Sequence, residues 1–327
     1  MIPYLSCDWG TSSFRLSLVD AENFRVIANE NTGNGILPTF DQWKETGKTD
    51  PVNRLRFYLD VIRHHINSIE IKIGKVLEGV PLIISGMASS SIGIKPLPYQ
   101  ELPFFIDGTG IPGEFVPHTA EFKHDILLIS GIKSEDDDVM RGEETQLIGM
   151  FAEDAMMKGD GLYIFPGTHS KHINVKGNRA VSFKTYMTGE FFDLLSKKSI
   201  LHAGLEEDDT EIGGASKEYF EQAVTAGSKS SLLNVCFKVR TNSLFFKLTK
   251  KENFHYLSGL LIGAELGEIM RNDTITIHLC CGTKLRNYYE TALKVLGLKN
   301  VYSYTAASVE KAAMIGQYKI YENYIKR

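Results

Sequence analysis

The stretch CDWGTSSFRLSLVD, residues 7–20, ends an apolar strand in an aspartate and follows it with a turn of small residues. Beyond the turn, apolar and polar residues alternate, which predicts a second strand. Glycine allows the sharp bend and lets a ligand approach the backbone. The N–H groups and hydroxyls of Gly10, Thr11 and Ser12 can bind phosphate oxygens, so we predict a phosphate-binding turn.

Asp8 is unfavourable for phosphate binding by itself, because a bare carboxylate repels phosphate. A divalent cation between the two groups removes the repulsion. We therefore expect Asp8 to organise Mg²⁺, through water, while the turn binds the phosphates of a nucleotide. Arg15 would add positive charge to the same site. The alternative is a plain hairpin in which aspartate and threonine only cap the turn.

A second Gly-Thr turn follows another apolar strand in YIFPGTHSKHINV, residues 163–175, without an aspartate. It lies nearly half the chain beyond the first turn, and similar α/β segments follow both, so we predict an internal duplication. Two such turns facing each other would clamp one polyphosphate. The expected donors of the second turn are Gly167, Thr168, His169, Ser170 and Lys171. Lys171 either neutralises charge during the reaction or points to solvent.

Composition places the chain among ordinary globular proteins. It has 327 residues, 43% of them hydrophobic and 23% charged, which is typical of two domains. A formal net charge of -4 gives no basic surface for nucleic acid. We expect neither an export signal nor a membrane span. The four cysteines lack metal-binding spacing, which favours buried thiols in a reducing cytoplasm. For the oligomeric state, a homodimer is one candidate.

Hydrophobic periodicity predicts an α/β fold in both halves. The expected strands are residues 3–8, 14–19, 24–29, 80–85, 124–130, 161–165, 171–175, 180–186, 274–281 and 301–305. The expected helices are residues 55–69, 142–157, 189–197, 216–226, 254–271, 282–297 and 308–326. Gly259 and Gly263 lie four apart on one of these helices, which allows close helix packing or close approach of a base; packing is favoured for Gly263.

Six motifs resemble the actin/hexokinase/sugar-kinase superfamily and, more closely, the 2-dehydro-3-deoxygalactonokinase family. They are DWGTSSFR (8–15), SGMASSSIG (85–93) with PLPY (96–99), DVMRGEETQL (138–147), FPGTHSK (165–171), MTGEFFDLL (187–195) and LSGLLIGAE (257–265). The chain departs from the family pattern at Ser89, Ile94 and His172, which replace a glycine and two tryptophans.

The resemblance implies two duplicated ribonuclease-H-like domains, with mixed sheets, flanking helices and an active-site cleft between them. Residues 1–155 would carry the first turn and the sugar-acid site, and residues 156–327 the second turn and the adenosine side. The implied reaction is phosphorylation of the terminal hydroxyl of 2-dehydro-3-deoxy-D-galactonate by ATP with Mg²⁺, giving the 6-phosphate and ADP in D-galactonate breakdown. Gly282, Thr283 and Leu285 resemble the adenosine-side loop of the superfamily.

The catalytic base is expected near the start of the helix before the second turn, as in related sugar kinases. Asp138, Glu143 and Glu144 are candidates, and Glu143 is preferred because it is nearest the expected helix start. Glu144 could instead cap the helix. Arg141 suits the substrate carboxylate because a guanidinium binds it through two hydrogen bonds. An ion pair with a neighbouring acid is the alternative for Arg141.

Sugar hydroxyls are expected to contact the loop after the buried strand at residues 80–85. The candidate residues are Ser85, Gly86, Met87, Ser89, Ser90 and Tyr99. Serines also cap helices, which is the alternative for each of them. Thr188 and Glu190 either border the site or begin a helix.

Three other functions are alternatives to this one. The first is a kinase for another sugar, sugar acid or polyol, the second is an actin-type ATP switch, and the third is a sugar-binding regulator. The acidic motif at residues 138–147 favours a kinase over a switch, because a hydroxyl acceptor must lose a proton. Asp8 argues against a regulator, which would not need the metal-organising carboxylate.

Overall fold

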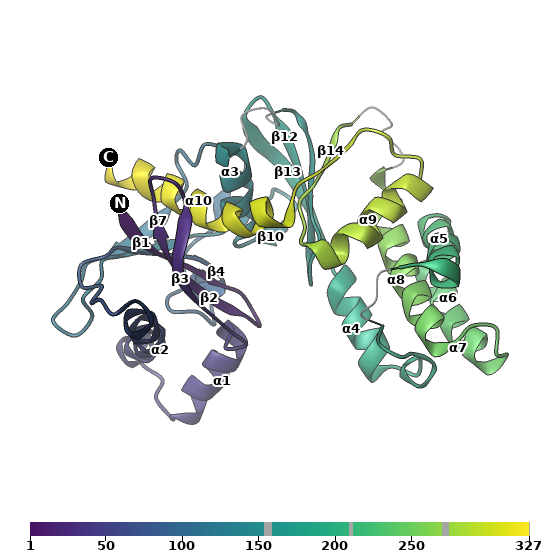
Figure 1. The fold of residues 1–327 in the computed structure, drawn as a ribbon, viewed down its shortest axis with the longest axis horizontal. Helices are drawn as coiled ribbons and strands as arrows, with labels where there is room; N and C mark the ends of the chain where they lie inside the picture. The colour runs from purple at the N-terminus through teal and green to yellow at the C-terminus, as the bar shows by residue number, and fades with distance from the viewer. Residues whose placement is uncertain (154–158, 209–211, 270–274, 327) are drawn as a thin grey trace. The chain divides into compact units, whose positions relative to one another are not determined.

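The computed structural model describes residues 1–153, 159–208, 212–269 and 275–326. It divides into two compact units (Figure 1). The first unit comprises Met1–Gly159, Lys176–Ser182 and Ser308–Arg327, and the second comprises Asp160–Val175 and Phe183–Ala307. The boundary predicted between residues 155 and 156 lies outside the described residues and stays a prediction.

The first unit is built on a mixed sheet with the strand order β3-β2-β1-β4-β8-β7. The strands are β1 (Pro3–Trp9), β2 (Phe14–Asp20), β3 (Arg25–Thr32), β4 (Leu82–Gly86), β7 (Gly113–Val116) and β8 (Ile126–Ile129). β1, β2 and β3 pair antiparallel, whereas β1, β4 and β8 run parallel. The strands predicted over residues 80–85 and 124–130 are confirmed, and every residue of β4 and β8 is buried, as is typical of strands with continuous apolar sequences.

Helices cover both faces of this sheet (Figure 1). On one side lie α1 (Ile36–Glu45) and α2 (Pro51–Ile73), and Ile62, Ile66 and Ile69 of α2 join the strand residues in one core. α2 begins where Asp50 accepts a hydrogen bond from the Asn53 N–H at 2.9 Å, and it ends at Gly74, whose φ is 65°.

On the other face lie α3 (Glu143–Glu153) and α10 (Ala306–Ile325). They meet through glycines: a Cβ at Gly149 would lie 1.8 Å from the Ala312 carbonyl oxygen, and one at Gly316 would lie 1.8 Å from the Thr145 carbonyl oxygen. Residues 154–157 of the predicted helix lie outside the described residues. Short strands that the sequence did not predict complete this unit: β5 (Gln100–Glu101), β6 (Phe104–Phe105), β9 (Ile132–Lys133) and β10 (Val139–Met140).

The second unit repeats the topology of the first. The strands are β11 (Gly161–Phe165), β12 (Ser170–Lys176), β13 (Arg179–Tyr186), β14 (Ile277–Leu279) and β15 (Val301–Ser303). β6 pairs with the Arg179 end of β13, and the order is β15-β14-β11-β12-β13-β6. β11 and β12 pair antiparallel, while β11, β14 and β15 run parallel. The predicted duplication is therefore visible in the strand order and direction. Thr274, the first residue predicted for β14, lies outside the described residues.

Some helices of the second unit pack on its sheet, and others pack on these helices. The helices of this unit are α4 (Thr188–Lys198), α5 (Gly214–Lys229), α6 (Leu232–Val235), α7 (Phe237–Leu244), α8 (Lys250–Leu266) and α9 (Thr283–Val295). Residues of α5, α8 and α9 share a core with Leu162 and Ile164 of β11. The sequence did not predict α6 and α7, and residues 270–271 of the helix predicted over 254–271 lie outside the described residues.

Close packing of α5 and α8 explains the glycine pair at positions 259 and 263. A Cβ at Gly263 would lie 2.2 Å from the Val224 carbonyl oxygen, and one at Gly259 would lie 2.5 Å from that of Phe220. The packing role expected for Gly263 is confirmed, and Gly259 has the same role. Cys280 and Cys281 are buried, as expected. Among the described helices, none is long and apolar enough to cross a membrane.

Candidate active site

The first predicted phosphate turn joins β1 to β2 and is held by α1. The Gly10 N–H donates to the Ser13 carbonyl at 2.9 Å, which closes the turn. The N–H groups of Ile36 and Leu37, at the start of α1, donate to the carbonyls of Gly10 and Thr11 at 2.9 and 3.0 Å. Because these carbonyls are bound to α1 and Thr11 and Ser12 are exposed, the turn can offer N–H and hydroxyl donors to a ligand.

Asp8 and Arg15 stand directly opposite each other on β1 and β2. The Arg15 guanidinium lies 2.9 Å from Asp8 Oδ2, while the other carboxylate oxygen, Oδ1, lies 3.4 Å from the position of a Cβ at Gly86. The Asp8 side chain is 19% exposed. Among the described residues no cluster of three His, Cys, Asp or Glu side chains could hold a metal ion. Mg²⁺ that arrives with a nucleotide needs fewer protein ligands, because phosphates and water supply the others, so Asp8 fits that use.

The acidic motif lies beside this aspartate. Gly142, just before α3, has a φ of 107°, and a Cβ there would lie 3.5 Å from the Gly86 Cα. Gly86 is the last residue of β4, which pairs with β1, and a Cβ at Gly86 would lie 3.4 Å from Asp8 Oδ1. The ends of β1 and β4 and the start of α3 therefore meet at two glycines. A Cβ at Gly86 would lie 2.7 Å from the Trp9 carbonyl oxygen, and the positive φ of both residues favours glycine.

The three candidate bases occupy different environments. Glu144 is buried, and both of its carboxylate oxygens accept the Gly142 N–H, at 3.0 and 2.8 Å, which is the capping arrangement weighed as its alternative. Burial, and then the charge of Glu143, raise the pKa of Glu144 to about 8. Glu143 is half-buried and accepts the Arg141 N–H at 3.2 Å. Asp138 lies in the turn between β9 and β10, where it accepts the Val139 N–H at 2.7 Å.

Three predicted substrate residues, Ser89, Tyr99 and Arg141, come together. The Arg141 guanidinium lies 4.0 Å from the centre of the Tyr99 ring and donates to Ser89 Oγ at 2.5 Å and to the Leu97 carbonyl at 3.2 Å. Its Nε is buried without a hydrogen-bond partner. The partners that the structure gives the Arg141 side chain are therefore the Tyr99 ring, the Ser89 hydroxyl and the Leu97 carbonyl.

Gly131 is a residue that sequence reasoning missed. A Cβ at this position would lie 2.5 Å from Arg141 Cγ and 2.9 Å from the Tyr99 ring, so only glycine leaves room for the stacked pair. The glycine directly after a buried strand was its only signal. Gln317 was missed as well: its Nε2 donates to the Cys7 carbonyl and to Ser85 Oγ, both at 2.9 Å.

The remaining loop residues are placed as follows. Ser85 is buried and its hydroxyl is occupied by Gln317. Met87 and Ser89 are the first and last residues of a short 3-10 helix, and the Ser90 N–H donates to the Met87 carbonyl at 3.0 Å. The Ser90 hydroxyl is buried and has no partner, which leaves a polar atom that a ligand could satisfy.

The second predicted phosphate turn is held from inside its own unit. Ser170 is buried, and its hydroxyl accepts the Gly167 N–H at 3.4 Å and shares a hydrogen bond with the Tyr289 hydroxyl at 3.1 Å. Thr168 and His169 are exposed at the tip of the turn. The Glu190 N–H donates to the Thr168 carbonyl at 3.0 Å, and the Glu190 carboxylate lies 2.5 Å from His169 Nε2.

Lys171 does not reach solvent. Its side chain is 5% exposed, and Nζ donates to Thr185 Oγ1 at 2.7 Å. The alternative that Lys171 points to solvent is therefore wrong, because β12 continues from the turn and places this residue inside the sheet. The candidate adenosine-side residues Gly282, Thr283 and Leu285 are exposed at the start of α9.

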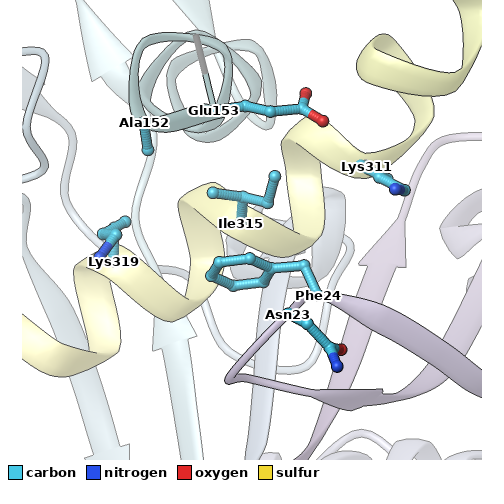
Figure 2. Close-up of a pocket in the computed structure, with 7 residues that line it drawn as sticks. All are labelled: Asn23, Phe24, Ala152, Glu153, Lys311, Ile315 and Lys319. Atoms are coloured by element: carbon cyan, nitrogen blue, oxygen red, sulfur yellow. The ribbon is translucent and has the colours of Figure 1, made fainter. Parts of the chain in front are cut away.

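A pocket of about 300 Å³ lies elsewhere in the first unit, where the turn between β2 and β3 meets α10. Phe24 lies beside Ile315 of α10, with Lys311 and Lys319 on either side (Figure 2). None of the predicted site residues lines it, because it lies at the opposite end of β2 from the phosphate turn.

Comparison with known proteins shows that the chain matches one family over nearly its whole length. A model of the family described as 2-keto-3-deoxy-galactonokinase matches residues 8–319. The chain belongs to this family. The kinase is 30% identical over 318 residues to the probable 2-dehydro-3-deoxygalactonokinase of Rhizobium meliloti (strain 1021), covering 95% of each chain. It is 33% identical over 227 residues to the 2-dehydro-3-deoxygalactonokinase of Escherichia coli (strain K12), covering 67% of this chain and 72% of that relative.

Solved structures agree with this assignment. A crystal structure of a Sinorhizobium meliloti protein assigned to the same enzyme superposes on the kinase with a TM-score of 0.78 at 29% identity, covering 98% of this chain and 96% of that one. The activator of 2-hydroxyisocaproyl-CoA dehydratase from Clostridium difficile, solved with bound ADPNP, shares the fold alone, with a TM-score of 0.50 at 11% identity. These comparisons confirm the predicted family and the actin-like α/β fold. They also confirm the kinase reaction, with ATP as phosphoryl donor and an alcohol as acceptor.

Proposed function

We propose that this kinase transfers the γ-phosphoryl group of MgATP to the terminal hydroxyl of 2-dehydro-3-deoxy-D-galactonate, giving the 6-phosphate and ADP. The observation that carries the proposal is the meeting of β1, β4 and α3 at Gly86 and Gly142, which brings Asp8 next to the acidic motif. Phosphoryl transfer needs a metal-organising carboxylate and a proton acceptor close together, and we assign these roles to Asp8 and to the acidic motif at this junction.

Each unit carries residues that we propose for contacts with the nucleotide. In the first, Asp8 organises Mg²⁺ through water, and Gly10, Thr11 and Ser12 donate to phosphate oxygens, with Arg15 adding positive charge. In the second, the exposed residues Thr168 and His169 are the better donors, because the Gly167 N–H and the Ser170 hydroxyl already bond within the unit. Gly282, Thr283 and Leu285 would contact the adenosine.

Glu143 is the base that we propose. It is partly exposed at the start of α3, whereas Glu144 is buried and both of its oxygens are occupied by the Gly142 N–H. Glu143 would take the proton of the terminal hydroxyl while that oxygen bonds to the γ-phosphorus and ADP leaves. Glu144 then holds the loop before α3 in place.

Arg141 would bind the carboxylate of the sugar acid. Its Nε–H is buried and unpartnered, and a carboxylate would satisfy this donor together with a neighbouring guanidinium N–H. The Tyr99 ring, whose centre lies 4.0 Å from the guanidinium carbon, limits the movement of the guanidinium. This arrangement favours a sugar acid over a neutral sugar or a polyol as the acceptor.

Variants of the two carboxylates test the proposal. Purified wild type, Asp8→Asn, Glu143→Gln and a control, Asp60→Asn, would be assayed for ADP release with a panel of 2-keto-3-deoxy sugar acids, aldonates and free sugars. We expect Asp8→Asn and Glu143→Gln to keep their circular dichroism spectra and to lose turnover by roughly 10²–10⁴-fold. Asp60 is on the exposed side of α2, 53% exposed, so its variant should behave as wild type.

Two outcomes would contradict parts of this proposal. Wild-type turnover in Glu143→Gln, with loss in Asp138→Asn or Glu144→Gln, would move the base to another carboxylate. A wild-type enzyme that responds to free sugars but to no sugar acid would overturn the substrate assignment and the role of Arg141.

The cell compartment that we propose is the cytoplasm. All four cysteines have free thiols, and three of them are buried. Thiols persist in a reducing compartment, where disulfides are rare.

A further inference from the structure

The carboxylate of Glu265 is the centre of a buried hydrogen-bond network in the second unit. It accepts from His172 Nε2 at 2.9 Å, from the Tyr289 hydroxyl at 2.8 Å and from the Thr188 hydroxyl. Glu265 is 3% exposed, and His172 is as deeply buried. The three donors come from β12, α9 and the first residue of α4. One side chain of α8 therefore joins three other elements of the unit.

Local stability does not account for a glutamate here. A buried carboxylate loses its hydration, which costs several kcal/mol, and a well-packed apolar residue in its place is often neutral or stabilising. The position is also unfavourable for a negative charge, because Glu265 lies in the last turn of α8, where the helix dipole is negative. The three hydrogen bonds offset these costs, so the gain must lie in the geometry that they impose.

The network ends at the second phosphate turn, and its direction is fixed. The Tyr289 hydroxyl donates to Glu265, so it accepts from the Ser170 hydroxyl, whose oxygen accepts the Gly167 N–H. Burial and the charge of Glu265 raise the pKa of Tyr289 well above its usual range, which keeps the donating proton on the hydroxyl. Because the Glu265 carboxylate can only accept hydrogen bonds, every donor in this series of hydrogen bonds must point toward it.

The same network reaches the turn by a second path, through α4. Thr188 begins this helix, and the next residues contact the turn directly: the Glu190 N–H donates to Thr168, and a Cβ at Gly189 would lie 2.5 Å from the Gly167 carbonyl oxygen. Tyr289, for its part, is on α9, whose first residues are the candidate adenosine contacts. The phosphate and adenosine parts of the second unit are thus tied to one carboxylate.

We propose that Glu265 is a positioning residue for the nucleotide: through Tyr289, Ser170 and Thr188 it fixes the second phosphate turn relative to the start of α9. This inference rests on the proposed contact between that turn and ATP. It follows that breaking the network weakens binding of MgATP but leaves binding of the sugar acid unchanged.

Two neighbouring tyrosines of α9 provide a matched test. Tyr289→Phe removes the hydroxyl that joins Glu265 to Ser170, whereas Tyr288→Phe removes a hydroxyl that bonds to His255 Nδ1 at 2.8 Å, outside the network. Michaelis constants for MgATP and sugar acid would be measured, with calorimetric binding of a non-hydrolysable ATP analogue. We expect Tyr289→Phe to weaken nucleotide binding by about tenfold and Tyr288→Phe by less than about twofold. The Michaelis constant for the sugar acid should stay unchanged in both.

Thr188 separates a hydrogen-bonding role from a packing role. Thr188→Val keeps the shape without the hydroxyl, and Thr188→Ser keeps the hydroxyl. We expect the valine variant to lose nucleotide affinity and the serine variant to retain it. Glu265→Gln should give the largest loss, because its amide N–H₂ would meet donors. If that variant does not fold, the Thr188 and Tyr289 pairs still decide the question.

A Thr168→Pro variant distinguishes failure of this inference from failure of the proposed function, because it removes one of the proposed phosphate-binding N–H groups. If Thr168→Pro folds and binds nucleotide as wild type does, the turn does not hold ATP and the proposed function fails. If Thr168→Pro loses nucleotide but Tyr289→Phe and Thr188→Val do not, only the positioning role of Glu265 is overturned. Equal weakening of nucleotide and sugar acid in the network variants would also overturn it.

Discussion

Neighbouring acids at the start of α3 differ because of what surrounds each side chain. Glu143 and Glu144 are adjacent in sequence, yet Glu143 is half-buried and Glu144 is buried with its oxygens on the Gly142 N–H. The sequence could offer both as bases and offer capping as the alternative for Glu144. The choice depends on which side of α3 packs against the sheet.

Glu144 should make stability depend on pH. Its pKa rises from 4.5 to about 8 because of burial, so between these values the folded protein holds a proton that the unfolded chain releases. The contribution of Glu144 to folding stability is therefore full below about pH 4.5 and falls as pH rises toward 8, by an amount on the order of a few kcal/mol. Glu144→Gln cannot titrate and should lack this decline.

Urea unfolding at about pH 5 and about pH 8 would measure this difference. The free energy of unfolding of wild type should fall relative to that of Glu144→Gln as pH rises. Glu121→Gln, at a side chain that is 66% exposed, serves as the control and should follow wild type. If the free energies of unfolding of wild type and Glu144→Gln change in parallel with pH, Glu144 is ionised in the folded protein over this whole pH range and the prediction is wrong.

Helix pairs in both units approach through glycines, and this sets where the site residues lie. α5 and α8 pack at Gly227, Gly259 and Gly263, and α3 and α10 pack at Gly149 and Gly316. The second contact matters for the site because Gly316 meets the Thr145 carbonyl, in the first turn of α3. Without that close approach, the acidic start of α3 could not stay beside β4.

Gly316→Ala should destabilise the first unit. Alanine is the better helix former by about 1 kcal/mol, but its Cβ would lie 1.8 Å from the Thr145 carbonyl oxygen, and overpacking typically costs about 1–3 kcal/mol. We expect a net loss in the free energy of unfolding, together with lower turnover as α3 shifts. Gly33→Ala, where a Cβ would meet nothing within 4 Å, is the control. An unchanged denaturation midpoint for Gly316→Ala would mean that the two helices can separate without cost.

The whole chain is a duplication in which the last helix belongs with the first strands. The strand order β3-β2-β1-β4-β8 recurs as β13-β12-β11-β14-β15, and residues 308–327 join the first unit. The Tyr4 hydroxyl donates to the Met314 carbonyl at 3.0 Å, and Gln317 donates to the Cys7 carbonyl at 2.9 Å. A fold of this kind completes its first unit only after the second has been synthesised.

A shortened chain tests this dependence. A chain ending at Ala307 lacks these contacts and leaves one face of the first sheet without α10, so residues 1–153 should become sensitive to protease and kinase activity should be lost. A chain ending at Ile325, where α10 ends, should resist protease like wild type. Mass spectrometry of limited-digestion fragments distinguishes the two. A protease-resistant fragment of residues 1–153 from the shorter chain would contradict the dependence on α10.

The sequence by itself determined the features that depend on neighbours within a few residues. Strand and helix periods, the two Gly-Thr turns, Asp8 and the acidic motif all follow from local spacing, and together they identified the family and the kinase reaction. Short strands such as β5 and β9 were missed because two residues carry no readable period.

Only the tertiary structure decided which distant side chains share an environment. Arg141 stacks on Tyr99 because Gly131 leaves room, Lys171 is buried against Thr185, and Glu265 collects donors from three other elements. The physical reason is that burial and hydrogen-bond partners depend on packing between segments far apart in the chain, whereas periodicity reports only which face of an element is apolar.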